Sequence, residues 1–274
     1  MLAFEIHRLV QSFLPQIQKA CSFQRKNIFL GITLILIGLF KKLVIADRIS
    51  HIVNLVFNSP DQYQGSAVGL AVFLARYQIY CDFSGYSDIA IGTARLFGIE
   101  LLQNFSFPYF SRDIAEFWRR WHISLSSWFK DYLYIPLGGS KGGMSTQVRN
   151  TFIIFIVSGF WHGANWTFIV WGLLNAIYFL PLLLTHKNRT HIETVAKGNI
   201  LPNAKEFLNM AITFCLTVLA WIFFRAENVT HAIEYISGIF SKSLFSIPEI
   251  RPTKILLLLL LFNLIEWLGR EQKF

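Results

Sequence analysis

Apolar stretches alternate with short polar segments along most of this chain. A helix that crosses a bilayer needs about 20 predominantly apolar residues. Stretches that approach this length occupy residues 27–46, 150–164, 166–185, 207–224 and 255–268. The first contains Lys41 and Lys42, which we expect to snorkel to a membrane interface, and Asp47-Arg48 closes it. The pattern predicts an all-α membrane protein with several spans.

A further apolar stretch, residues 66–102, is interrupted by Arg76, Asp82, Asp88 and Arg95. A lipid-facing helix would not tolerate these charges, whereas a helix pair or a re-entrant hairpin packed inside the protein would. Gly85 and the neighbouring hydroxyls favour a turn between Asp82 and Asp88. We expect the two aspartates to pair with Arg76, Arg95 or a basic residue of the next helix, in a structural role.

A tryptophan-rich helix is predicted after Pro108, with Ser111 as its N-cap and with Pro136 and Gly138-Gly139 ending it. Its apolar residues recur every three or four positions and form an aromatic stripe: Ile114, Trp118, Trp121, Leu125, Trp128 and Tyr132. Basic residues flank this stripe, which is typical of a helix at the membrane interface. Residues 186–206 read as a polar loop and residues 228–240 as a short amphipathic helix.

Composition supports a membrane protein. Of 274 residues, 54% are hydrophobic, 16% are aromatic and 15% are charged, against roughly 25% charged in soluble domains. The net charge of +9 is dispersed between apolar stretches, which favours contact with lipid headgroups and argues against nucleic-acid binding. Cys21, Cys81 and Cys215 show neither metal-ligand spacing nor a disulfide framework.

His162 is the strongest candidate for chemistry. It follows Trp161 inside an apolar, aromatic stretch, and an ionisable residue at membrane depth is usually functional. A neutral imidazole there can act as a general base. Gly159 and Gly163 leave room for a helix or a substrate, and Asn165 adds a donor and an acceptor. The alternative is a structural histidine that is hydrogen-bonded between helices.

His122 lies in the tryptophan-rich helix, near Arg119 and Arg120. From local sequence alone, an interfacial structural role and a catalytic role are equally supported. A metal site is not predicted, because histidine and cysteine residues lack ligand spacing, and nucleotide-binding and serine-nucleophile motifs are absent.

Four segments in combination resemble the membrane-bound O-acyltransferase (MBOAT) family, in particular its bacterial branch for alginate O-acetylation. The resemblance rests on Asp82–Gly92 with the following Leu96–Gly98, Asn104-Phe105 and Pro108-Tyr109, on Phe117–Gly139, on Gly159–Trp166, and on Ala220–Ala226.

The resemblance implies a single membrane-embedded region, residues 1–274, with transmembrane, re-entrant and interfacial helices around a tunnel. It implies an O-acyltransferase in the bacterial cytoplasmic membrane, with His162 as the essential catalytic residue and His122 as its companion. The acyl group would be acetyl, from a cytoplasmic donor such as acetyl-CoA, and would move toward an extracytoplasmic polysaccharide. Arg119, Arg120 and Lys130 would attract the donor's phosphates, and Asn165 would contribute to substrate binding. No bound cofactor is expected, and the expected partners are an SGNH-hydrolase-type acetyltransferase and the polysaccharide synthesis machinery.

Family members are longer, so we expect this chain to correspond to the C-terminal part of the family fold, without the preceding membrane helices. Two alternatives stay open. One is transfer of D-alanyl or another acyl group to a cell-envelope acceptor, and the other is a non-catalytic membrane subunit of a polysaccharide export or modification complex.

Overall fold

A computed structural model describes residues 15–16, 18 and 24–272. Its elements are helices and loops, and the described residues contain no strand, which confirms the predicted all-α class. The α-helices are α2 (Arg25–Leu39), α3 (Asp47–Phe57), α4 (Gly65–Leu96), α5 (Ile114–Arg120), α6 (Ile123–Phe129), α7 (Gly143–His162), α8 (Trp166–Leu184), α9 (Ala204–Arg225), α10 (Val229–Ile239) and α11 (Thr253–Gly269). The shorter elements are the π-helical segments η1 (Phe40–Ala46) and η4 (Lys130–Tyr134) and the 3₁₀ turns η2 (Pro60–Gln62), η3 (Pro108–Phe110) and η5 (Lys242–Phe245).

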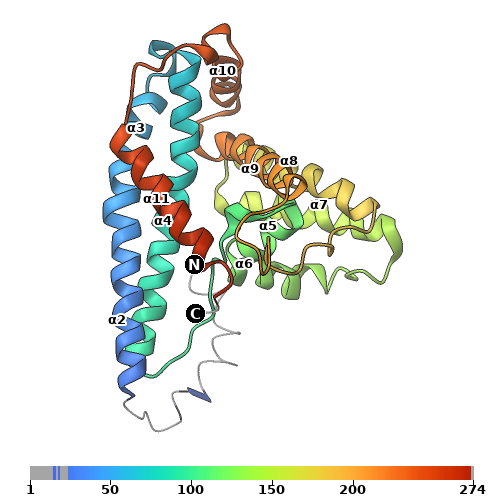
Figure 1. The fold of residues 1–274 in the computed structure, drawn as a ribbon. Coiled ribbons are helices and arrows are strands. Elements are labelled where there is room, and N and C mark those ends of the chain that lie inside the picture. Colours follow the sequence, from blue (N-terminus) through green and yellow to red (C-terminus); the bar gives the residue numbers. More distant parts are fainter. Residues whose placement is uncertain (1–14, 17, 19–23, 273–274) are drawn as a thin grey trace.

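The helices form two groups (Figure 1). On the left of the view, α2 and α4 run side by side along most of their length, and α11 crosses in front of them. On the right, α5 to α9 form the second group. Tyr77 and Tyr80 of α4 donate hydrogen bonds to Asn263 (2.9 Å) and Glu266 (2.6 Å) of α11. Side-chain hydrogen bonds therefore fix α11 across the first group.

The first helix is longer than the sequence indicated. Asp47 does not close it, since α2, η1 and α3 form one helical run from Arg25 to Phe57. A π-helical segment, which often marks a functional site, lies in its middle. This segment contains Lys41 and Lys42 and directs them toward α4 and α11, where both form ion pairs. For Lys41, the predicted snorkelling is therefore wrong, because a carboxylate neutralises its charge inside the protein.

The predicted turn between Asp82 and Asp88 is also wrong, because α4 is a single helix of 32 residues. Lys41 Nζ lies 2.9 Å from Asp88 Oδ2, and Lys42 forms an ion pair with Asp82. Because each aspartate is paired with a lysine, its charge can lie within a continuous helix. The aspartates thus pair with lysines of the neighbouring helix and not with Arg76 or Arg95.

Gly85 allows α2 and α4 to pack closely and does not form a turn. A Cβ built on Gly85 would lie 2.7 Å from the carbonyl oxygen of Gly38, and one on Gly92 would lie 2.5 Å from that of Gly31. The contacts are reciprocal, since a Cβ on Gly38 or Gly31 would meet the carbonyl of its α4 partner. Small residues let helix backbones approach in this way. These glycines hold α2 and α4 together as an antiparallel pair.

The tryptophan-rich helix is not continuous, in contrast to the prediction. It begins at Ile114 with Asp113 as the N-cap, not Ser111, whose hydroxyl donates to the Pro108 carbonyl (2.7 Å). It breaks at Trp121 and His122, and His122 has a left-handed backbone with φ +44°. The aromatic stripe is therefore divided between α5, α6 and η4.

The second half of the chain agrees with the apolar pattern. Helices α7 and α8 match the two predicted apolar segments, and α9 and α11 match the two later spans. Residues 228–240 form α10, as predicted. Three helical runs in the described part of the chain are long and apolar enough to cross a membrane: Arg25–Phe57, Trp166–Leu184 and Ala204–Arg225.

Candidate active site

His162 ends α7 at the junction with α8. The two helices pack closely here because both contact positions are glycines. A Cβ on Gly159 would lie closer than 3.0 Å to the Phe168 backbone, and a Cβ on Gly172 would lie closer than 3.0 Å to the Phe155 backbone. The His162 ring is edge-on to Trp171 (5.3 Å between centroids) and Phe224 (4.9 Å). Neither ring nitrogen is hydrogen-bonded to another described residue, so both remain available to a substrate.

His122 lies at the break between α5 and α6. A left-handed conformation costs a non-glycine residue roughly 1–2 kcal/mol and occurs often at functional sites. Asn104 stabilises it: the Asn104 carbonyl accepts from the Ile123 backbone N–H (2.9 Å), and Oδ1 accepts from the Ser124 backbone N–H (3.2 Å). His122 Nδ1 also lies 3.1 Å from Asn104 Oδ1. The ring packs edge-on against Phe83 of α4, with centroids 4.6 Å apart.

The two histidines lie within electrostatic reach of each other, a question that the sequence left open. Burial, and to a smaller extent the charge of His162, lower the pKa of His122 from its usual 6.5 to about 4. An influence of one charge on the other requires a short separation. His122 is therefore neutral at physiological pH and faces the same region as His162.

Aromatic side chains fill the space around the histidines. Trp121 packs against Trp221 (5.3 Å), which packs against Phe224 (4.6 Å) and Trp171 (5.9 Å), both in contact with the His162 ring. These side chains come from α8, α9 and the end of α5. They make the surroundings of the histidines largely apolar, which strengthens electrostatic interactions there.

Arg76 of α4 lies on the other side of this aromatic group, with 1% of its surface exposed. Its guanidinium carbon is within 4.7–4.9 Å of the rings of Tyr109, Phe117, Trp121 and Trp221. None of its side-chain nitrogens has a hydrogen-bond partner among the described residues. A desolvated cation–π contact contributes about 2 kcal/mol. Stacking on four rings thus offsets part of the cost of burying this charge.

The three residues expected to attract donor phosphates differ in their surroundings. Arg119 donates to the carbonyls of Asn188 (2.7 Å) and His191 (2.8 Å), and burial lowers its pKa. Arg120 pairs with Glu116 (2.9 Å), while Lys130 is exposed at the start of η4. Arg119 thus binds the segment that follows α8, and Arg120 binds the buried Glu116. Their role in binding phosphate stays a prediction.

A buried ion network around Arg112 joins α5 to α9. Arg112 binds Glu116 through two nitrogens (3.1 Å each) and Glu206 of α9 (3.1 Å), and it donates to the Glu193 carbonyl (2.5 Å). Hydrogen bonding to the two carboxylates raises the pKa of Arg112 against the opposing effect of burial. The network fixes the first turn of α5 and thereby the position of His122 at its other end.

Asn165 caps α8. Its Oδ1 accepts from the Thr167 backbone N–H (3.1 Å), and its Nδ2 donates to the Glu227 carbonyl (2.7 Å). Both groups of the amide are thus used to hold the α7–α8 junction against the α9–α10 connection. The part it plays in substrate binding stays a prediction.

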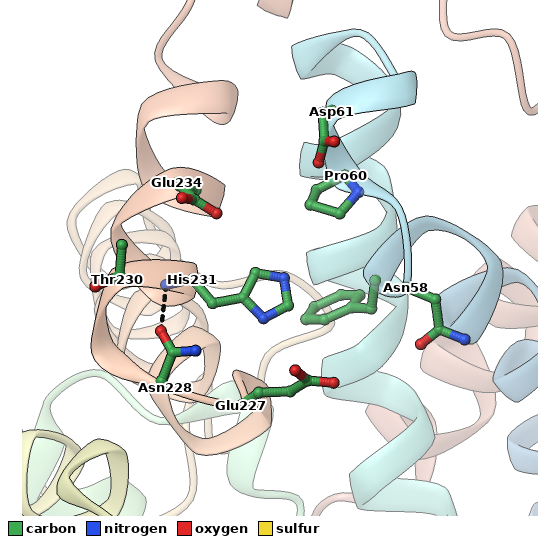
Figure 2. Close-up of a pocket in the computed structure, with 9 residues that line it drawn as sticks. Asn58, Pro60, Asp61, Glu227, Asn228, Thr230, His231 and Glu234 are labelled. Carbon is green, nitrogen blue, oxygen red and sulfur yellow. Dashed lines mark hydrogen bonds between the residues drawn. The ribbon is translucent and has the colours of Figure 1, made fainter.

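A cavity of about 590 Å³ opens between α10 and the connection from α3 to α4 (Figure 2). The residues that line it are Phe57, Asn58, Pro60, Asp61, Glu227, Asn228, Thr230, His231 and Glu234. In the view, the ring of His231 points into it between the carboxylates. Three acidic side chains repel phosphate groups, so the cavity does not suit a nucleotide-containing donor. It contains none of the predicted site residues.

No group of three or more histidine, cysteine, aspartate or glutamate side chains in the described ranges has an arrangement that could hold a metal ion. The site itself offers two imidazoles in an apolar, aromatic setting. This combination suits proton transfer during attack of a hydroxyl group on an acyl carbon.

An α-helical membrane protein with a histidine pair enclosed by aromatic side chains is the class that the fold and site define. Residues 7–241 match the model of the membrane-bound O-acyltransferase family, and the chain belongs to this family.

Three relatives show what the chain is similar to. The chain is 42% identical to a peptidoglycan O-acetyltransferase of Helicobacter pylori, with 78% of this chain and 39% of the relative aligned. It is 39% identical to a probable alginate O-acetylase, AlgI, of Pseudomonas aeruginosa, over 80% of this chain and 40% of the relative. It is 31% identical to a teichoic acid D-alanyltransferase of Bacillus subtilis, over 55% of this chain and 40% of the relative. The chain thus spans about two fifths of the length of these relatives.

Sequence reasoning missed three contributions to the site. Asn104 was named only as part of a family motif, and nothing in the neighbouring sequence predicts its contact with His122. Arg76 was expected to pair with an aspartate, and nothing in the sequence indicates an aromatic cage. The i,i+4 spacing of Arg112 and Glu116 was a detectable signal for their ion pair.

Proposed function

We propose that this chain takes part in O-acyl transfer, moving an acetyl group from a cytoplasmic donor such as acetyl-CoA toward a hydroxyl of an extracytoplasmic polysaccharide. The observation that carries the proposal is His162, whose ring nitrogens have no hydrogen-bond partner among the described residues, within electrostatic reach of a second histidine in an apolar site. Family membership supplies the reaction class, and the names of the relatives supply the acceptor class.

In the proposed reaction, His162 acts as the general base. It takes the proton of the acceptor hydroxyl while the hydroxyl oxygen attacks the thioester carbonyl carbon. The C–O bond forms, the C–S bond breaks, and the thiolate leaves with the proton returned by the His162 imidazolium. A neutral imidazole in an apolar site suits this role because it can accept a proton without first losing one.

Acetyl is favoured over D-alanyl by the degree of similarity. The acetyl-transferring relatives are 39–42% identical over about four fifths of the chain, whereas the D-alanyltransferase of Bacillus subtilis is 31% identical over 55% of it. Transfer of D-alanyl to a cell-envelope acceptor is the second candidate. A non-catalytic subunit of a polysaccharide export or modification complex is the third, and the free nitrogens of His162 argue against it.

We further propose that the protein lies in the bacterial cytoplasmic membrane and works with an SGNH-hydrolase-type acetyltransferase and the polysaccharide synthesis machinery. The apolar helices support a membrane location. The route of the acyl group, from a cytoplasmic donor to an acceptor outside the cell, supports a partner protein that completes the transfer.

The test is O-acetylation of surface polysaccharide in cells that lack the native gene. They are complemented with this chain, or with this chain preceded by upstream coding sequence, each as wild type, His162→Gln and His231→Gln. Loss of a general base lowers the rate about 10²–10⁴-fold, so we expect His162→Gln to abolish detectable acetylation. His231→Gln, in the separate cavity, is the matched control and should retain it. Acetylation that survives His162→Gln contradicts the proposal.

A further inference from the structure

The amide of Asn104 has a defined orientation. In an asparagine side chain the oxygen and nitrogen are assigned from their hydrogen bonds. The backbone N–H of Ser124 donates to the Asn104 side-chain atom at 3.2 Å, and a backbone N–H requires an acceptor. The Ser124 hydroxyl also donates to the same atom (3.1 Å). That atom is therefore the amide oxygen.

This orientation determines the state of the neighbouring imidazole. His122 Nδ1 lies 3.1 Å from the same oxygen, and an amide oxygen can only accept. Nδ1 must therefore hold a proton and donate it. In a neutral imidazole only one nitrogen is protonated, so the lone pair is at Nε2.

Other groups around His122 do not compete with this arrangement. The ring contacts Phe83 of α4 and Phe105 of the α4–α5 connection, both apolar. Ser124 Oγ is 3.4 Å from Nδ1, and because its own proton is donated to Asn104 Oδ1 (3.1 Å), it can only accept from Nδ1–H. His162 is the titratable group whose charge reaches His122, and it opposes protonation. The imidazole is thus held neutral with a single defined tautomer.

We propose that Asn104 is a positioning residue that fixes His122 as the Nδ1–H tautomer, so that Nε2 accepts a hydrogen bond from a hydroxyl of the acceptor. The role of Nε2 rests on the proposed function. In this state Nε2 has no proton to donate, so His122 orients the acceptor and does not stabilise the negative oxygen of the tetrahedral intermediate. Hydroxyl-rich acceptors, such as the glycan of peptidoglycan or an exopolysaccharide, match this requirement.

The experiment measures the pKa of His122 directly, from the pH dependence of hydrogen–deuterium exchange at the imidazole C2 position, by mass spectrometry. The full chain is used in detergent or nanodiscs, as wild type, Asn104→Asp, Asn104→Leu and Ser124→Ala. A carboxylate beside the Nδ1–H favours the imidazolium, by about 1–3 pKa units for a nearby opposite charge. We expect the pKa of His122 to rise by at least one unit in Asn104→Asp and to stay unchanged in Ser124→Ala. An unchanged pKa in a folded Asn104→Asp variant would overturn the proposal.

Acetyl transfer is the second readout. Asn104→Leu should reduce it about a hundredfold, as expected when a group that orients the acceptor is misplaced, while Ser124→Ala should stay within twofold of wild type. Full activity of Asn104→Leu overturns the positioning role. If wild type itself transfers no acetyl group, the proposed function fails, and the exchange measurement still decides whether Asn104 fixes the tautomer.

Discussion

At the scale of single residues, His122 depends on a local departure from helical geometry. A regular helix would place it one turn from Trp118 and Ser126 and point it along the aromatic stripe. The left-handed backbone at φ +44° ends that row and turns the ring toward Phe83 and Asn104. Asn104 accepts four hydrogen bonds, from the backbone N–H groups of Ile123 and Ser124, from the Ser124 hydroxyl and from His122 Nδ1, and these offset the cost of this conformation. A residue outside the helix therefore determines how His122 is presented.

Two adjacent lysines of η1 differ in their surroundings and allow a matched comparison. Lys41 lies between Asp88 (2.9 Å) and Glu266 (4.0 Å), with side-chain exposures of 13%, 21% and 7% respectively. Lys42 pairs with Asp82 and Asp47, and its side chain is 42% exposed. Lys41 thus pairs with the buried Glu266 and the part-buried Asp88, while Lys42 pairs near the surface.

We expect Lys41→Met to lower the free energy of unfolding by about 3–5 kcal/mol, because the buried Glu266 and the part-buried Asp88 lose the cation that they share. Lys42→Met should cost about 1 kcal/mol or less, as for exposed pairs. Unfolding with increasing denaturant in detergent, followed by tryptophan fluorescence, measures both. Equal losses would place the Lys42–Asp82 pair in hydrocarbon, where it cannot be solvated, and would contradict its assignment to the surface.

At the scale of elements, α4 shows why a polar interruption does not always end a helix. Gly85, flanked by Asp82 and Asp88, looks like a turn when the chain is considered alone. In the structure each aspartate meets a lysine of η1, and Gly85 lies against the Gly38 backbone. The neighbouring helix thus converts turn-like residues into packing and pairing residues. The sequence-based error arose because the partner lies far away along the chain.

The α2–α4 contact gives a prediction about glycines in one helix. Gly85→Ala places a Cβ 2.7 Å from the Gly38 carbonyl oxygen, whereas the nearest atom to a Cβ on Gly69 is 3.8 Å away. We expect Gly85→Ala to destabilise the protein by about 1–3 kcal/mol through overpacking. Gly69→Ala should stabilise it by about 0.5–1 kcal/mol, because alanine loses less entropy in a helix.

Thermal unfolding in detergent, followed by circular dichroism, distinguishes the two alanine variants. If both raise the melting temperature equally, the close approach of α2 and α4 is not present in the protein.

At the scale of the whole molecule, the described residues form a helical protein with large apolar side chains on its outside. On α9 these include Phe207 (64% exposed), Leu208 (58%) and Ile212 (50%). Exposed apolar patches of this kind mark an interaction surface, and in a protein of this family lipid is the natural contact. Cys215 is exposed on the same helix, while Cys81 is buried.

The exposed face of α9 can be tested through Cys215 in the Cys21→Ser background. A thiol in hydrocarbon stays protonated and reacts slowly with polar reagents. In opened membranes, we expect a charged maleimide to leave Cys215 unlabelled and a lipophilic maleimide to label it. Cys81 should react only after unfolding, and Ser140→Cys, on a polar loop, should react with both reagents. Rapid labelling of Cys215 by the charged maleimide would show that α9 does not face lipid.

The sequence by itself determined the helical class, most of the apolar spans, the family, and the location of His162 between two apolar segments. These features depend on local hydrophobic patterns and on contiguous motifs. The tertiary structure alone decided the pairing of Lys41 with Asp88, the continuity of α4, the break at His122 and the closeness of the two histidines. Each depends on whether a polar group finds a partner from a distant part of the chain. Burial makes such pairing energetically decisive, and no local pattern records it.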